Sequence, residues 1–216
     1  LKNKNDDHGW GSFYGQSSRT YLTCLALRSL AAIDPFSEVL LLGQNWLFAN
    51  KNKNLPAWGA TLNSPPTILH TGFVLITLSE LNLGFDSKVI ESSLEWLTEN
   101  IDPKKSVESE SLVEDYDIYY QKNGSRETYQ NSLPHYALPI AISALLRHKN
   151  ALDNDLIYQG LLAIANAPAL QCDSNTRNNR DWRATMLSLA IFGGNKVDSS
   201  VLDPGEAKFR SPGLLL

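Results

Sequence analysis

Two stretches of this chain repeat one pattern about fifty residues apart. Each begins with a tryptophan followed by a glycine, first at Trp10 and again, 48 residues later, at Trp58. An apolar segment opened by Thr20 or Thr71 comes next, and a second segment then ends in a Trp-Leu pair. A unit of this length that reads loop, helix, turn, helix is typical of stacked helical hairpins. The repeat therefore predicts an all-α architecture.

The two helices of each unit differ in how their apolar residues are arranged. Residues 67–81 are apolar on nearly every side, whereas residues 86–99 place Lys88, Glu91 and Glu95 on one side. A helix that is apolar all round is buried all round, and a one-sided helix lies at the surface. We therefore expect the first helix of each pair inside and the second outside, as in two concentric rings.

Counting the units through the chain gives about three and a half hairpins in a single domain of residues 1–216. We place them at about 10–53, 57–101, 132–166 and 181–216. Trp182 takes the place in the last unit that Trp10 and Trp58 hold in the first two. Residues 102–131 are acidic, and we expect an inserted loop there. The next inner helix should resume near Ser132, with Pro139 in its first regular turn or at a kink.

Composition narrows the class of protein. Apolar residues make up 43% and charged residues 19% of the chain, which is ordinary for a globular domain. The net charge of −4 gives no reason to expect nucleic-acid binding. The sequence has no apolar run long enough for a transmembrane helix. Cys24 and Cys172 cannot make a disulfide framework, so we expect a reduced, cytoplasmic setting.

The repeated elements resemble a known family. They are Gly9-Trp10-Gly11 with Gln44-Asn45-Trp46-Leu47, and Ala57-Trp58-Gly59 with Glu95-Trp96-Leu97. This pattern is similar to the prenyltransferase/squalene oxidase repeat, the unit of the terpenoid-cyclase-like (α/α)6 toroid. The resemblance covers residues 8–100 well and residues 132–193 more weakly. It implies that the tryptophans staple neighbouring repeats.

A complete toroid of this family has six hairpins, and this chain has fewer than four. The resemblance therefore implies an incomplete ring. Such a ring is open, or is completed by further sequence, or is closed by a protein partner. An uncovered inner helix exposes apolar surface, which usually marks an interaction site.

The resemblance also suggests chemistry to look for. Proton-initiated cyclases of the family use an Asp-x-Asp-Asp motif, and its nearest match here is Asp115-Tyr116-Asp117, followed by Ile118. A general acid needs a carboxyl whose pKa is raised by burial. Acidic residues in a charged loop are more often solvated. The zinc site of the prenyltransferases has no match in Cys172-Asp173, so we predict neither a metal nor another cofactor.

Six residues remain as candidates for ligand binding. His70, and His135 with Tyr136, lie near the cavity face implied by the resemblance, although histidines in such places are more often satisfied by a neighbouring loop. Trp10, Trp58 and Trp182 are either inter-repeat staples or stacking surfaces for a ligand.

The function that we predict is a non-catalytic binding or scaffold module. It would recognise a protein or an apolar small molecule, as part of a larger chain or assembly. The alternative is a class II-type terpene or triterpene cyclase, or a fragment of one, that uses Asp115 or Asp117 as its acid.

Overall fold

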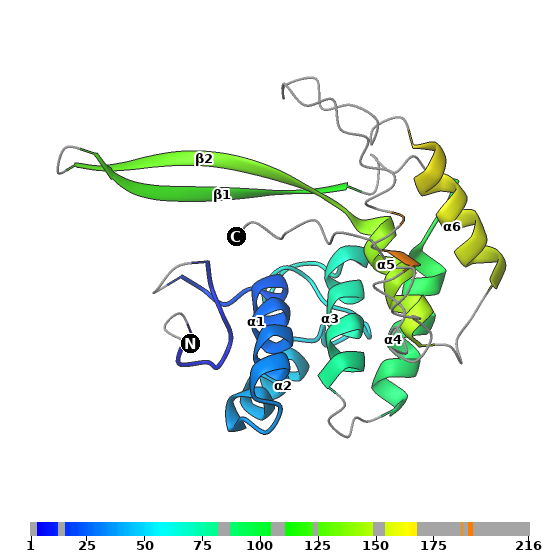
Figure 1. Cartoon of the computed structure of the whole chain (residues 1–216), viewed down its shortest axis with the longest axis horizontal. Coiled ribbons are helices and arrows are strands. Elements are labelled where there is room, and N and C mark those ends of the chain that lie inside the picture. Colours follow the sequence, from blue (N-terminus) through cyan, green and yellow to red (C-terminus); the bar gives the residue numbers. More distant parts are fainter. Residues whose placement is uncertain are drawn as a thin grey trace, which may run out of the picture.

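The computed structural model describes residues 4–12, 16–81, 87–104, 111–122, 125–148 and 154–167, together with Leu187, Ala190 and Ile191. These residues contain six helices in three consecutive hairpins, which confirms the predicted helical class (Figure 1). The hairpins are α1 (Thr20–Ile33) with α2 (Glu38–Ala49), α3 (Ile68–Leu81) with α4 (Ser87–Asn100), and α5 (Ala137–Arg147) with α6 (Asn154–Asn166).

The first helices of the pairs form the inside of the fold. Helix α1 packs on α3 and α3 packs on α5, whereas α2, α4 and α6 each pack on the first helix of their own pair. Eleven of the fourteen residues of α3 are buried. Only three of the fourteen residues of α4 are buried. Burial therefore confirms the predicted division into inner and outer helices for the second hairpin, whereas in the first hairpin α1 has four buried residues of fourteen and α2 has five of twelve.

Hydrogen bonds show how the first two repeats correspond. The Trp10 N–H donates to Thr23 Oγ1 at 3.0 Å, and the Trp58 N–H donates to Thr71 Oγ1 at 3.1 Å. In both repeats the tryptophan carbonyl also accepts the backbone N–H nine residues later, at 2.9 Å. Helices α1 and α3 are likewise 48 residues apart at both ends. The counterpart of Thr71 is therefore Thr23, and our alignment of Thr71 with Thr20 was wrong.

Thr20 instead connects the two repeats. Its Oγ1 donates to Gly59 O at 2.6 Å, and its N–H donates to Ala60 O at 2.9 Å. Both interactions lie at the start of α1, where backbone N–H groups have no partner inside the helix. The loop of the second repeat thus caps the first helix of the first repeat.

Steric contact explains why a glycine follows each tryptophan. A Cβ on Gly11 would lie 2.6 Å from the Gln16 carbonyl oxygen, and one on Gly59 would lie 2.5 Å from the Pro65 carbonyl oxygen. Neither backbone position can move easily, because each tryptophan beside it is anchored to a threonine. Trp58 is fully buried and donates its Nε1–H to Leu47 O at 2.7 Å. The sequence repeat is thus a packing requirement.

The acidic segment differs from the loop that we expected. Residues Ser111–Lys122 form β1 and Ser125–Tyr136 form β2, which pair as an antiparallel hairpin. Figure 1 shows the two strands as a long arm beyond the helices. Helix α5 consequently begins at Ala137, five residues after the predicted Ser132, and Pro139 lies in its first turn, as expected. The physical reason is β propensity, since Ile118, Tyr119 and Tyr120 favour a strand over a loop.

The prediction of a partial ring is not tested by the described residues. The fourth unit, 181–216, lies outside them except for Leu187, Ala190 and Ile191. Ala190 is fully buried and Leu187 packs against the core. No helix in the described part of the chain is long and apolar enough to cross a lipid bilayer.

Candidate ligand-binding cleft

The two tryptophans and the histidine predicted in the first two repeats lie in the packed interior. Trp10 is 6% exposed and Trp58 is fully buried, and both are held by the repeat hydrogen bonds. His70 is 1% exposed, and its Nδ1 lies 2.8 Å from Thr67 Oγ1 at the start of α3. This placement fits a structural role for all three side chains.

The other predicted site residues belong to the strands or lie outside the described residues. Asp115 pairs with Ser132 and Asp117 with Gln130, in the middle of the hairpin. His135 and Tyr136 end β2, next to α5. The structure describes only the backbone of these four residues. Trp182 lies outside the described part of the chain, so its role remains a prediction.

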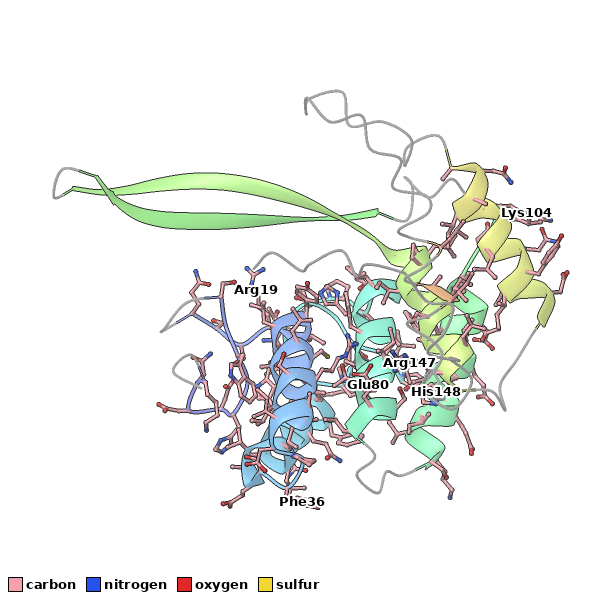
Figure 2. The ribbon with its side chains drawn as sticks, viewed as in Figure 1. Arg19, Phe36, Glu80, Lys104, Arg147 and His148 are labelled. Atoms are coloured by element: carbon pink, nitrogen blue, oxygen red, sulfur yellow. The ribbon has the colours of Figure 1, made fainter. Side chains whose placement is uncertain are left out.

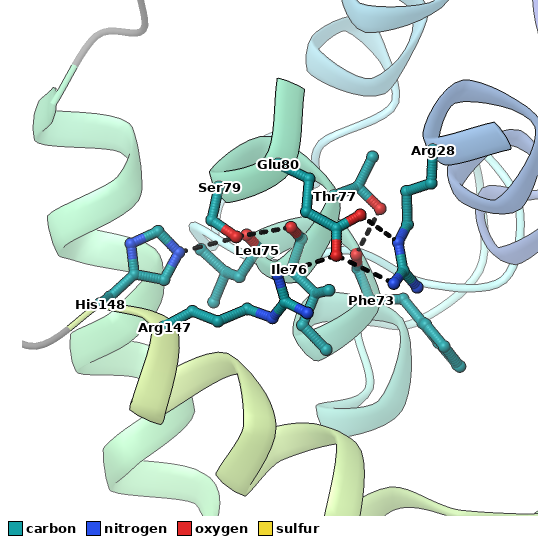
Figure 3. Close-up of polar contacts among 9 residues, drawn as sticks. All are labelled: Arg28, Phe73, Leu75, Ile76, Thr77, Ser79, Glu80, Arg147 and His148. Atoms are coloured by element: carbon teal, nitrogen blue, oxygen red, sulfur yellow. Dashed lines mark hydrogen bonds and ion pairs between the residues drawn. The ribbon is translucent and has the colours of Figure 1, made fainter. Parts of the chain in front are cut away.

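A charged cluster that sequence reasoning missed joins the three inner helices (Figure 3). Arg28 of α1 and Arg147 of α5 both bind Glu80 of α3. Arg28 donates from Nε to Glu80 Oε2 and, at 2.9 Å, from Nη2 to Oε1, which also lies 2.8 Å from Arg147 Nη1. The sequence signal was a single acidic residue, Glu80, near the end of an otherwise apolar helix.

Burial affects the bases in this region. It lowers the pKa of Arg147, although the charge of Glu80 opposes that shift. Burial also lowers the pKa of His148 below 6.5, so this imidazole is neutral at pH 7 and donates from Nε2 to Leu75 O at 3.1 Å. Arg147 Nε is buried and has no hydrogen-bond partner among the described residues. We assign the cluster a structural role, because its ion pairs join α1, α3 and α5 through Glu80.

An open cleft of about 1020 Å³ lies between the N-terminal loop, α2 and the loop before α3. Figure 1 shows the N-terminal loop beside the first hairpin, at the opposite end of the row from α6. The N-terminal loop contributes Asn5, Asp6, Asp7, His8, Gln16, Ser17 and Ser18 to the walls. The α2 side contributes Leu42, Asn45, Trp46, Ala49 and Asn50, and the loop before α3 contributes Thr61, Leu62 and Asn63.

Asp7 holds one wall of the cleft to the other. Its Oδ1 accepts hydrogen bonds from Ser18 Oγ at 2.7 Å and from the Gly9 N–H at 3.0 Å. Its Oδ2 accepts from Trp46 Nε1 at 2.8 Å. Burial raises the pKa of Asp7, but the bonds from Ser18 and Trp46 outweigh it and leave the pKa below 3.8. Asp7 is therefore an ionised anchor at neutral pH.

Two polar residues of the lining, Asp7 and His8, have no polar counterpart in the second repeat. The residues 48 positions after Asp7 and His8 are Leu55 and Pro56, and the second hairpin forms with them. His8 also has a φ of 70°, a left-handed conformation that is uncommon for residues other than glycine. Its ring Nδ1 lies 3.0 Å from Lys4 Nζ. A left-handed backbone at a residue other than glycine is local strain of the kind that gathers at functional sites, and it motivates a binding role for the cleft.

No group of three or more histidine, cysteine or acidic side chains suited to a metal ion occurs within the described residues. Neither a known protein family nor any curated protein matches this sequence at a significant level. The toroid resemblance thus rests only on the residues that carry it.

Proposed function

We propose that this protein is a non-catalytic binding module and that the cleft beside the N-terminal loop is its small-ligand site. The observation that carries the proposal is the cleft itself, which is open, has the volume of a small-molecule site and is lined by polar groups. The second repeat has Leu55 and Pro56 at the positions of Asp7 and His8, so the hairpin forms without those two polar side chains.

The electrostatics of the cleft favour binding over catalysis. A carboxyl that acts as a general acid at neutral pH needs a raised pKa. The pKa of Asp7 is lowered instead, and its two oxygens already accept three hydrogen bonds. Nothing in the described residues favours the cyclase alternative, which would depend on the side chains of Asp115 and Asp117.

The architecture that we propose is a segment of an α/α toroid. Three observations support it, namely the two layers of helices, the repeated Trp-Gly packing and the continuous row from α1 to α5. The buried Ala190 is also compatible with a further inner helix. An experimental structure that includes residues 168–216 tests this proposal. A fourth first helix packed on α5 would support it, and a different packing of that segment would contradict it.

A scaffold role has its own supporting observation at the turn between α1 and α2. Ile33 is 83% exposed and Phe36 is 94% exposed, and Figure 2 shows Phe36 at the end of this hairpin, far from Glu80 and Arg147. A photo-crosslinking amino acid in place of Phe36 should then capture a protein in cells. As a control, the same photo-crosslinking amino acid replaces Glu99, an exposed residue of α4. Equal labelling at both positions would contradict a contact at this turn.

The small-ligand proposal is tested by mapping the cleft with a mixed library. Amines, carboxylic acids, nucleosides and neutral sugars are each titrated into the 15N-labelled chain, and backbone amide shifts are followed by NMR. At least one class should shift the amides of residues 42–50 and 61–63 in a saturable manner. If no class does so, the cleft is not a small-ligand site.

A further inference from the structure

We propose that the cleft binds a neutral, hydroxyl-rich molecule of the size of a mono- or disaccharide. This inference rests on the proposed function and adds the chemical class of the ligand. It follows from the juxtaposition of unpaired side-chain amides, carboxylates and small apolar side chains on the walls of one open cleft.

The charge of the lining disfavours anions. The cleft is lined by two carboxylates, those of Asp6 and Asp7, and by no lysine or arginine. The lowered pKa of Asp7 keeps its charge at neutral pH. A phosphate or carboxylate ligand would therefore be repelled by both carboxylates, and Lys4, whose Nζ lies 3.0 Å from Nδ1 of the lining residue His8, offsets only part of that repulsion.

The hydrogen-bonding groups suit hydroxyls. Asn45 of α2 and Asn63 of the loop before α3 line the cleft, and neither side-chain amide has a partner among the described residues. Each amide offers two donors and an acceptor oxygen, which matches a hydroxyl that both donates and accepts. Asp6 adds a free carboxylate that can only accept. Such a mixture recognises several neighbouring hydroxyls at once.

A sugar also has apolar C–H faces, which can pack on the apolar surface in the cleft. Leu42, Ala49 and Leu62 contribute this surface, and Leu62 is 57% exposed. Trp46 is only 6% exposed, and its indole N–H is already given to Asp7. It therefore offers no stacking face, and we expect weak binding, with a Kd of roughly 1 mM.

A cationic ligand would be attracted by the same two carboxylates, but few groups on these walls could bind it directly. Both Asp7 oxygens already accept hydrogen bonds, so Asp6 is the one lining carboxylate that remains free to pair with an ammonium group. An isolated, exposed ion pair contributes little to affinity. The side-chain amides of Asn45 and Asn63, in contrast, can both donate hydrogen bonds to a neutral hydroxyl and accept them from it.

The test uses the full 216-residue chain, 15N-labelled, with four probes at matched concentrations. These are maltose, N,N′-diacetylchitobiose, spermidine and inorganic phosphate. We expect a disaccharide to shift the amides of Asn45, Leu62 and Asn63, and spermidine and phosphate not to. The double variant N45A/N63A should weaken that binding about tenfold or more, in line with the loss of two hydrogen bonds. The matched control N54A/N100A removes two exposed asparagines that do not line the cleft and should bind as the parent chain does.

The outcomes separate the ligand class from the site. Saturable shifts at the cleft with spermidine or phosphate and none with sugars would overturn the hydroxyl-rich class, and the site would stand. Sugar shifts that persist unchanged in a folded N45A/N63A would also overturn the inference. If none of the four probes and no class of the mixed library shifts the backbone amides of the cleft, the proposed function itself is wrong. The thermal midpoint of each variant confirms that it is folded.

Discussion

Arg28 and Glu80 lie 52 residues apart in the sequence and meet as a two-pronged ion pair between α1 and α3. Arg147 binds the same carboxylate from α5, so one acidic side chain joins all three inner helices. The side chains of Arg28, Glu80 and Arg147 are 31%, 25% and 11% exposed. Glu80 therefore holds together two partly buried cations that would otherwise repel each other.

We expect Glu80→Gln to destabilise the protein by about 2–3 kcal/mol, because it leaves two guanidinium groups close together without a counter-charge. Urea denaturation of the parent and variant measures the loss. The control is Glu95→Gln on α4, which removes an exposed carboxylate and should cost less than about 0.5 kcal/mol. Equal costs at the two positions would show that Glu80 is not a structural link.

The two repeat threonines should be energetically equivalent. Thr23→Val and Thr71→Val keep the side-chain shape. Each leaves the buried backbone N–H of a tryptophan, Trp10 or Trp58, without its acceptor. Each should cost about 1–3 kcal/mol in the free energy of unfolding. Thr98→Val on α4 is the control, because its hydroxyl donates only to a carbonyl of its own helix, Leu94 O. Costs at Thr23 or Thr71 no larger than at Thr98 would mean that these bonds do not fix the repeat.

Sequence reasoning predicted the part of the fold that depends on local pattern. The period of the tryptophans and the apolar faces of residues 67–81 and 86–99 correctly gave two layers of helices. The alignment of Thr20 with Thr71 failed because both residues open an apolar run. The hydrogen bonds from the tryptophan N–H groups and the 48-residue offset of α1 and α3 identify Thr23 as the true counterpart.

The hairpin β1–β2 could have been predicted but was not. Asn123-Gly124 separates two runs that include tyrosines, and this dipeptide is the strongest short-range sequence signal for a β-hairpin. The acidic residues of the segment indicate solvation but do not distinguish a loop from an exposed strand. The difference shows that charge alone does not define secondary structure.

The charged cluster and the cleft were beyond sequence reasoning for a different reason. Arg28, Glu80 and Arg147 come from three hairpins, and their meeting depends on how α1, α3 and α5 are aligned. The cleft likewise combines Asp7, Asn45 and Asn63 from three separate segments. Nothing in the local pattern of any one segment indicates the others.

Cys24 should be chemically inert in the folded protein. It is fully buried in α1, and burial raises the pKa of its thiol to about 12, so the reactive thiolate is nearly absent at pH 8. Iodoacetamide labelling at pH 8, read by mass spectrometry of the peptide that contains Cys24, should be at least about a hundredfold slower than in 8 M urea. Fast labelling of Cys24 in the folded chain would mean that α1 opens readily.

Asp7 should make the stability of the N-terminal loop depend on acid. The pKa of Asp7 is lower in the folded protein than its ordinary value of 3.8, because hydrogen bonds from Ser18 and Trp46 outweigh the effect of burial. A lowered carboxyl pKa gives stability that is present above the unfolded value and is lost as the pH falls through the folded value. Asp7→Asn should therefore destabilise the protein at pH 7, where the carboxylate accepts three hydrogen bonds, and much less at pH 2–3.

Denaturation of the parent and of Asp7→Asn at pH 7 and at pH 2–3 measures this difference, with Asp6→Asn as the control. Asp6 is exposed and makes no hydrogen bond to the described residues, so its variant should match the parent chain at both pH values. A pH-independent cost of Asp7→Asn would mean that shape and not charge holds the loop against Trp46. In that case the cleft would keep its form in acid, and ligand binding there would not weaken with the loss of the Asp7 charge.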